Sequence, residues 1–163
     1  RLDRAAALRA RQIAREIVRR REERSIETTQ QLVDAIVAAV PVPARFGGGH
    51  PAKRVFQAIR IAVNDELGQL ERALPLAWRA LRVGGRLAVI SYHSGEDRMV
   101  KQAFGAWSDA CSCPPGLPVC VCGQVPQGAT VPRRAVTAGE DELARNPRAR
   151  SAKLRIFRVN DAT

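Results

Sequence analysis

The sequence is poor in aromatic residues, and it contains no long apolar run. Phe, Trp and Tyr make up 4% of its 163 residues, which argues against a surface built of aromatic stacking platforms. The longest apolar stretch lies at about residues 35–43, much shorter than the roughly 20 residues that a membrane-spanning helix needs. No secretory signal is visible. We therefore expect no membrane-spanning helix, and we expect a cytoplasmic protein.

Acidic residues are also scarce relative to basic ones. Lys and Arg number 27 against 16 Asp and Glu, which gives a net charge of +11. Residues 1–24 carry nine Arg against four acids, and residues 133–158 carry eight basic residues against three acids. Such a surface attracts polyanions, with nucleic acid the first candidate and an acidic membrane face the second. Apolar residues reach 45%, so the chain can also bury a core.

The first part of the sequence has helical periodicity. Apolar spacing predicts one helix over residues 1–24 and a second over 29–40, which opens with a capping box formed by Thr28 and Gln31. A glycine-rich connector at residues 45–50 follows. A long helical pattern then begins at Pro51, and we expect Pro75 to kink or split it. Its predicted core stripe consists of Phe56, Ile59, Val63, Leu67, Leu70 and Leu74.

The remainder alternates strand and helix. The short apolar run 87–90, which follows two glycines, predicts a buried parallel strand. A helix capped by Ser94 and Asp97 should come next, then a loop rich in Cys, Pro and Gly at 108–132. A short helix at 140–145 and a strand at 154–159 complete the pattern. The fold class is therefore α/β.

Three segments, in this order, resemble the MraW/RsmH family: HPAKRVFQAIRIAVNDEL at 50–67, GGRLAVISYHSGEDR at 84–98 and NPRARSAKLR at 146–155. The resemblance implies S-adenosylmethionine-dependent methylation of the N4 amine of a cytosine in 16S ribosomal RNA. It implies a Rossmann-like class I methyltransferase sheet with an inserted all-helical domain that contacts RNA. Small-subunit ribosomal RNA or the assembled 30S subunit would be the partner, and the full-length protein could form a homodimer.

On this resemblance, residues 1–48 are part of the helical RNA-recognition insert, and residues 49–163 are the C-terminal portion of the methyltransferase domain, with the Cys-rich loop 108–132. The family's glycine-rich first turn and its DLGVSS segment would both lie upstream. We therefore expect no cofactor-binding residue in this chain, weak or no binding of S-adenosylmethionine, and no activity of the chain alone. The glycines at 47–49 are no substitute, because no buried strand precedes them.

The predicted strand should deliver Ser91, His93 and Ser94 to the edge of the sheet where ligands bind. We expect these residues to contact the target base or its ribose. The alternatives are structural: Ser94 and Asp97 would suffice as a helix cap, and His93 could bridge backbone groups at the strand end. The sequence assigns no catalytic residue.

Further substrate-binding candidates are polar or basic. Lys53, Arg60 and Asn64 form a polar stripe that borders the core stripe, and such a stripe either lines a cleft or is a solvated face. Arg98 is a candidate for phosphate contact. Arg148 and Arg150 suit phosphate positioning rather than base readout, and the alternative for both is a charged surface loop.

The four cysteines form two C-x-C pairs, Cys111 with Cys113 and Cys120 with Cys122. Four thiolates this close could hold a structural zinc ion, although C-x-x-C is the commoner spacing. Reduced thiols without metal and oxidised pairs remain alternatives. A second functional hypothesis follows, namely a non-catalytic basic RNA-binding module with a four-cysteine zinc site. A sheet strand at 84–92 would argue against that hypothesis, because a small zinc knuckle has no need of one.

Overall fold

The computed structural model describes residues 4–45, 49–109, 111, 113, 119 and 121–160. The chain divides into two compact units, Arg1–Asn64 and Asp65–Thr163. This division falls 16 residues after the domain boundary predicted from the sequence, and the assignment of residues 1–48 to an RNA-recognition insert stays a prediction. Among the described residues, no helix has the length and apolar character needed to cross a membrane.

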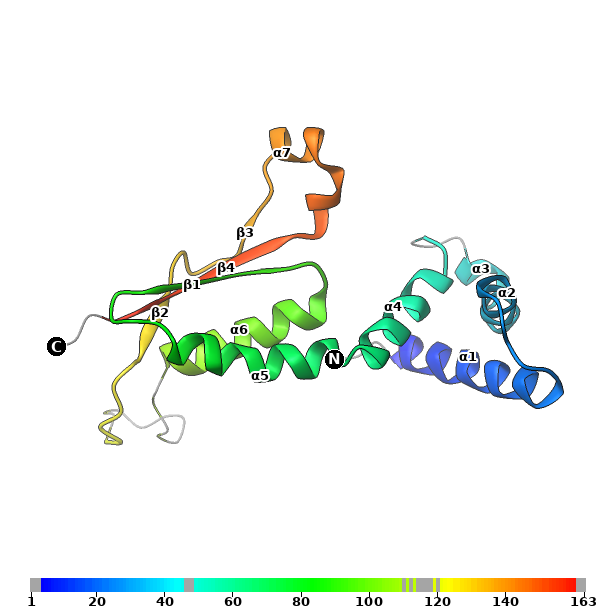
Figure 1. Cartoon of the computed structure of the whole chain (residues 1–163), viewed down its shortest axis with the longest axis horizontal. Coiled ribbons are helices and arrows are strands. Elements are labelled where there is room, and N and C mark those ends of the chain that lie inside the picture. The colour runs from blue at the N-terminus through cyan, green and yellow to red at the C-terminus, as the bar shows by residue number, and fades with distance from the viewer. Residues whose placement is uncertain are drawn as a thin grey trace. The chain divides into compact units, whose positions relative to one another are not determined.

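The first unit is helical (Figure 1). It contains α1 (Arg4–Glu23), α2 (Thr29–Ala39), α3 (Val42–Arg45) and α4 (Ala52–Val63). The predicted capping box of α2 is confirmed, because the Gln31 backbone N–H donates to Thr28 Oγ1 at 3.2 Å and the Thr28 N–H donates to Gln31 Oε1 at 3.1 Å. Its core is apolar and consists of Ile13, Ile36, Val40 and Ala52.

The long helix predicted from Pro51 onward breaks at a different place than expected. It ends at Val63, and α5 (Glu66–Arg79) starts after Asp65, whose backbone is left-handed with φ 50°. Asp adopts this conformation more readily than most residues do. Pro75 lies within α5 and neither ends nor splits it, so the prediction of a split was wrong, and the kink stays a prediction.

The core stripe predicted along this helix is also interrupted. Ile59 and Val63 are 41% and 78% exposed, so they are not core residues of this chain. The stripe fails because it spans two helices with different partners. Phe56 of α4 packs in the core of the first unit, whereas Leu74 of α5 packs in that of the second.

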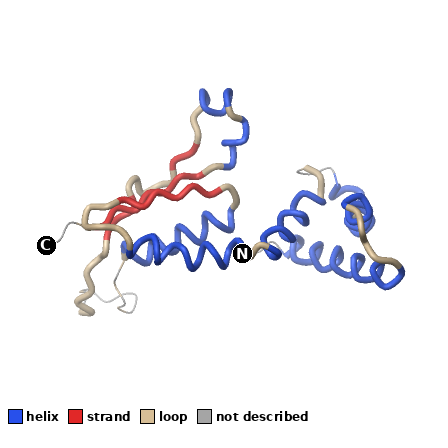
Figure 2. Tube along the Cα trace, in the orientation of Figure 1, coloured by secondary structure: helices blue, strands red, loops and turns tan. Residues whose placement is uncertain are grey.

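The second unit is an α/β arrangement with a small antiparallel sheet. After α5 come β1 (Arg86–Ser91), α6 (Ser94–Ser108), β2 (Gly128–Thr130), β3 (Val136–Thr137), α7 (Glu140–Arg145), a 3₁₀ helix η1 (Pro147–Ser151) and β4 (Lys153–Val159). The strand order is β1-β4-β2, and β3 also pairs with β4. In Figure 2, α5 and α6 lie on the same side of this sheet. The predicted helix at 140–145 and the final strand are confirmed.

The prediction of a buried parallel strand at 87–90 was wrong for this chain. β1 pairs with β4 in antiparallel register, with Ser91 opposite Lys153. Its side chains alternate in burial because helices cover only one face of the sheet. Ile90 is therefore 57% exposed, whereas the neighbouring Ser91 is buried.

An aromatic cluster between α5, α6 and β4 holds the second unit together. The ring centroids of Trp78 and Trp107 are 5.6 Å apart, and those of Trp107 and Phe157 are 5.3 Å apart in an edge-to-face arrangement. Phe104 and Phe157 are among the fully buried side chains. Thus four of the chain's seven aromatic residues lie in one core, and pairs of this geometry stabilise beyond their buried area.

This packing leaves no room for a side chain at Gly128. A Cβ there would lie 2.5 Å from Phe157 Cζ and would also overlap the Arg158 carbonyl oxygen. Gly105 on α6 differs, since nothing lies within 4 Å of the Cβ position there.

We predict opposite effects of alanine at these two glycines. Gly128→Ala should lower the free energy of unfolding by about 2 kcal/mol, because the aromatic core must shift to admit the methyl group. Gly105→Ala should raise it by about 0.5–1 kcal/mol through helix propensity. Urea unfolding followed by circular dichroism measures both. Equal stabilities of Gly128→Ala and the parent chain would contradict the packing described here.

Candidate functional site

Most of the predicted site residues of the second unit gather at one end of its sheet. β1 ends at Ser91, α6 begins at Ser94, and the antiparallel register brings the start of β4 to the same end. The 3₁₀ helix η1, which carries Arg148 and Arg150, leads directly into β4. Arg98 lies in the second turn of α6 and is exposed, as are Arg148 and Arg150. We call this region the sheet-end site.

His93 is the N-cap of α6. Its Nδ1 accepts hydrogen bonds from the backbone N–H groups of Gly95 at 3.1 Å and Glu96 at 3.2 Å. In return, Glu96 Oε2 accepts from the backbone N–H groups of Tyr92 at 2.9 Å and His93 at 3.1 Å. The prediction that Ser94 and Asp97 cap this helix was wrong, because the imidazole nitrogen takes the place that a hydroxyl or carboxylate oxygen usually has.

This cap fixes the tautomer of the His93 ring. Because Nδ1 accepts two hydrogen bonds, the proton of the neutral ring is on Nε2. Nε2 is buried and lies 3.3 Å from Glu96 Oε1, without the alignment of a good hydrogen bond. The side chain is 14% exposed. The ring therefore has one remaining N–H donor, which is buried, and its acceptor nitrogen is used by the cap.

Glu66, at the start of α5, joins His93 and Glu96. Ligand atoms of these three side chains lie within 4.8 Å of one another. The trio supplies two carboxylates beside an imidazole, which are groups that can accept hydrogen bonds from an amine or hold a divalent cation. The sequence did not predict the role of Glu66, because 27 residues separate it from His93 and no local motif links them.

Asp97 joins α6 to β4 through three charge-assisted hydrogen bonds. Arg155 donates from Nε to Oδ1 at 2.7 Å and from Nη2 to Oδ2 at 3.3 Å, and Lys153 Nζ donates to Oδ2 at 3.2 Å. The hydrogen bonds from Arg155 are the main reason why the pKa of Asp97 lies below its ordinary value of 3.8, and burial opposes the shift. Asp97 therefore remains ionised and fixes the sheet-end site.

Ser91 is 3% exposed, and its hydroxyl donates to the Lys153 carbonyl oxygen at 3.4 Å. Ser94, by contrast, is exposed at the first position of α6. Three residues were predicted to contact the base or ribose. The side chains of Ser91 and His93 thus form hydrogen bonds within the chain, and Ser94 faces solvent.

A basic pocket between α6 and β2 was missed by the sequence reasoning. Its volume is about 430 Å³, and its charged lining residues are three basic ones, Lys101, Arg133 and Arg155, and one acid, Asp109. Arg155 also pairs with Asp97, so this basic pocket borders the Asp97 ion pairs. The excess of positive charge at 133–158 was the available signal, but Lys101 lies outside that range, and only the fold brings it to Arg133.

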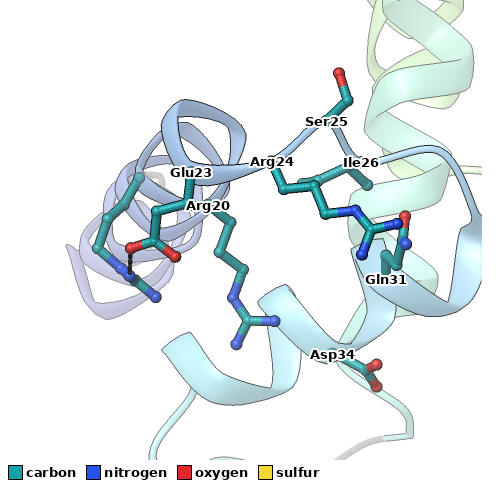
Figure 3. A pocket seen from close by; sticks show the side chains of 8 residues that line it. Arg20, Glu23, Arg24, Ser25, Ile26, Gln31 and Asp34 are labelled. Carbon is teal, nitrogen blue, oxygen red and sulfur yellow. Dashed lines mark hydrogen bonds and ion pairs between the residues drawn. The ribbon is translucent and has the colours of Figure 1, made fainter.

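A second pocket, of about 290 Å³, lies in the first unit between the end of α1 and α2. In Figure 3 the guanidinium groups of Arg20 and Arg24 point into it, whereas the Ser25 side chain points away. Hydrogen bonds from Arg19 and Arg20 lower the pKa of Glu16 to about 2, so these two arginines are partly neutralised. Arg24 lines the same pocket, together with the carboxylates of Glu23 and Asp34.

The other predicted site residues belong to the first unit. Lys53 and Arg60 lie on α4, Asn64 is its C-cap residue, and all three are exposed. Helix α3 precedes the glycine-rich connector, and this agrees with the expectation that no strand leads into it.

Three of the four cysteines converge. Sulfur atoms of Cys111, Cys113 and Cys122 lie within 4.8 Å of one another, and the prediction for Cys120 lies outside the described residues. The cysteine trio presents soft ligands of a type suited to a metal ion, whereas in the Glu66–His93–Glu96 trio the His93 Nδ1 and Glu96 Oε2 atoms are used by the helix cap.

Comparison with known proteins gives a consistent result. The model of the MraW methylase family matches residues 6–160. Proteins named ribosomal RNA small subunit methyltransferase H are similar to this chain: that of Symbiobacterium thermophilum is 62% identical over 90% of this chain and 46% of the relative, and that of Heliobacterium modesticaldum is 56% identical over 90% and 47%. The chain spans about half the length of these curated relatives.

We predict that Asp97→Asn lowers the free energy of unfolding by about 3 kcal/mol at neutral pH, because Arg155 and Lys153 lose a nearly buried anion. Because the pKa of Asp97 is lower in the fold than in the unfolded chain, its contribution is present above pH 3.8 and is lost as the pH falls below that value. The stability difference between parent and variant should therefore shrink on acidification. Urea unfolding between pH 7 and pH 3 tests this, with Glu71→Gln on α5 as the control that changes little. A difference that does not vary with pH would count against the ion pairs.

We also predict that the capping role of His93 can be replaced. His93→Ala should cost about 1 kcal/mol of stability, whereas His93→Asp should retain most of it, because Asp is among the best N-cap residues. Thermal unfolding compares the two variants with the parent chain. If Asp destabilises as much as Ala, capping is not what His93 contributes.

Proposed function

The chain belongs to the MraW methylase family. We propose that, as part of a protein of the family's full length, it takes part in the transfer of a methyl group from S-adenosylmethionine to the N4 amine of a cytosine in 16S ribosomal RNA. The observation that carries this proposal is the match over residues 6–160, together with 62% identity to a relative named as a ribosomal RNA methyltransferase. The small-subunit ribosomal RNA or the 30S particle is the proposed partner.

The residues described here do not fit the cofactor itself. A methyltransferase or dinucleotide fold holds its cofactor where a strand leads into a glycine-rich turn. Among the described residues, no strand runs into a turn with several glycines, and β1 is followed instead by Tyr92, His93 and Ser94. We therefore propose that S-adenosylmethionine is bound by family segments outside this chain, and we assign none of its contacts here.

The part proposed for this chain is recognition of the target base. The N4 amine of cytosine is a hydrogen-bond donor, and Glu and Asp side chains can accept a hydrogen bond from it. Glu66 and Glu96 offer carboxylates at the sheet-end site, where His93 holds Glu96 in place through the cap. Orientation of the amine toward the methyl group is the main catalytic requirement, because its lone pair is delocalised into the ring. Ser94 would reach the ribose or base from its exposed position.

Phosphate contacts are the second part of the proposal. Arg98, Arg148 and Arg150 are exposed around the sheet-end site, and the basic pocket adds Lys101 and Arg133. Guanidinium groups bind phosphate oxygens in a bidentate manner, which positions RNA without reading its sequence. In the first unit, Lys53, Arg60, Asn64 and the arginines of α1 would extend this contact.

The decisive experiment joins this chain to the N-terminal half of the Symbiobacterium relative. We expect the joined protein to bind S-adenosylmethionine and to transfer a labelled methyl group to 30S subunits that lack the modification. The chain alone should show no cofactor binding by calorimetry. Tight binding by the chain alone would overturn the assignment of the cofactor site, and RNA binding without methyl transfer by the joined protein would favour a non-catalytic RNA-binding module.

We predict that Arg148→Ala/Arg150→Ala weakens binding of this chain to small-subunit RNA and lowers the slope of log affinity against log salt by about 1–2, as expected for the loss of one or two phosphate contacts. The matched control is Arg79→Ala/Arg82→Ala, which removes the same charge from exposed positions at and just beyond the end of α5. Filter binding at several salt concentrations measures both slopes. An equal loss of RNA affinity and of salt dependence in both variants would mean that RNA binding depends only on the net charge of the chain.

A further inference from the structure

We propose that Cys111, Cys113 and Cys122 bind one zinc ion, which ties together the loop between α6 and β2. This proposal is independent of the proposed function, because it concerns a structural metal site and not methyl transfer. It rests on the positions of the sulfur atoms, on a hydrogen bond to one of them, and on the composition of the loop.

The sulfur atoms have the spacing of ligands on a single small ion. All three lie within 4.8 Å of one another, and the Sγ atoms of Cys111 and Cys122 are 3.9 Å apart. With a Zn–S bond of about 2.3 Å, two corners of a tetrahedron lie about 3.8 Å apart. In a [4Fe–4S] cluster each cysteine binds a different iron atom, so the sulfur ligands would be more widely spaced. The separation of 3.9 Å is also about twice the S–S bond of a disulfide, roughly 2.05 Å.

A backbone group supports one of the sulfur atoms. The Val121 N–H donates to Cys113 Sγ at 3.4 Å. Hydrogen bonds of this kind stabilise the negative charge of a thiolate and orient it toward a metal, as outer partners of metal ligands do. The bond also links the two C-x-C pairs across the loop, since Val121 lies between Cys120 and Cys122 in the sequence.

Among the described residues of the loop, apolar burial does not hold the segment between its two ends in place. Its ends are fixed, because the Gln127 N–H donates to the Trp107 carbonyl at 2.9 Å and Asn160 Nδ2 donates to the Pro126 carbonyl at 2.7 Å. Between these ends the described apolar side chains are not buried: Val119, Val121 and Val125 are 69%, 76% and 73% exposed. The described residues between α6 and β2 form no helix or strand, and a long connection of this kind usually needs a constraint or a function. Metal ligation supplies the constraint that apolar burial does not.

The donor set favours a soft or borderline cation such as zinc over the hard cations. Thiolates are soft ligands that bind zinc and copper(I) and disfavour magnesium and calcium. Structural zinc sites are four-coordinate, so one further ligand completes the site. The structure describes three of the sulfur ligands, and the proposal concerns these three.

The first test measures metal in the chain purified under reducing conditions. We expect about one zinc ion per chain, as for a structural site, and loss of at least about nine-tenths of it in Cys111→Ser, Cys113→Ser and Cys122→Ser. Val119→Ser and Val121→Ser are matched controls from the same loop, because they change exposed side chains and leave the thiols intact. Both should retain the zinc of the parent chain. The proposal would be overturned if the parent chain, after refolding with zinc present, held less than about one-tenth of a zinc ion.

The second test does not depend on the folding of any variant. Titration of the parent chain with a mercurial thiol reagent should release zinc in proportion to the thiols modified. Replacement of zinc by cobalt(II) should give the thiolate-to-metal charge-transfer band and the strong visible bands of a tetrahedral site, with an intensity that indicates three or more thiolates. Zinc that stays bound after all thiols have reacted, or a cobalt spectrum with two thiolates or fewer, would refute the site.

Discussion

The second unit depends on the hydrogen bonds that Asp97 accepts from Arg155 and Lys153. These bonds join the first turns of α6 to the start of β4. Lys153 and Arg155 lie on β4, the strand that pairs with every other strand of the sheet, and Asp97 lies four residues after the N-cap of α6. Removal of this anion is costly, because Arg155, whose side chain is 12% exposed, would be left nearly buried without a counter-charge. The position of His93, Glu96 and the end of β1 follows from this fixed point.

The sheet-end site thus combines a rigid support with exposed basic groups. His93 is used for capping and fixes Glu96, while Glu66 approaches from α5. Around them, Arg98, Arg148 and Arg150 face solvent. A site that presents carboxylates to an amine and guanidinium groups to phosphates matches the chemistry proposed for a cytosine within structured RNA.

Local signals in the sequence predicted local structure well. The Thr28–Gln31 capping box, the helix at 140–145 and the last strand follow from patterns of a few residues, and the structure confirms them. Predictions failed where the outcome depends on distant partners. The apolar run 87–90 gave no sign that β4 would pair with it in antiparallel register, and Ile59 and Val63 matched a core stripe although the helix breaks at Asp65. The role of Asp97 was missed for the same reason, since Arg155 is 58 residues away.

The central claim is that this chain recognises the cytosine whose N4 amine is methylated. Mass spectrometry of nucleosides from 30S subunits treated with the joined full-length protein and S-adenosylmethionine tests it most directly, with Glu66→Gln/Glu96→Gln as the comparison. We expect N4-methylcytidine from the parent protein and, in the linear phase of the reaction, at least about a tenfold lower yield from the double variant, which corresponds to about 1.4 kcal/mol of lost transition-state stabilisation. Methylation of a different atom, or an undiminished yield from a double variant that folds and binds cofactor normally, would contradict it.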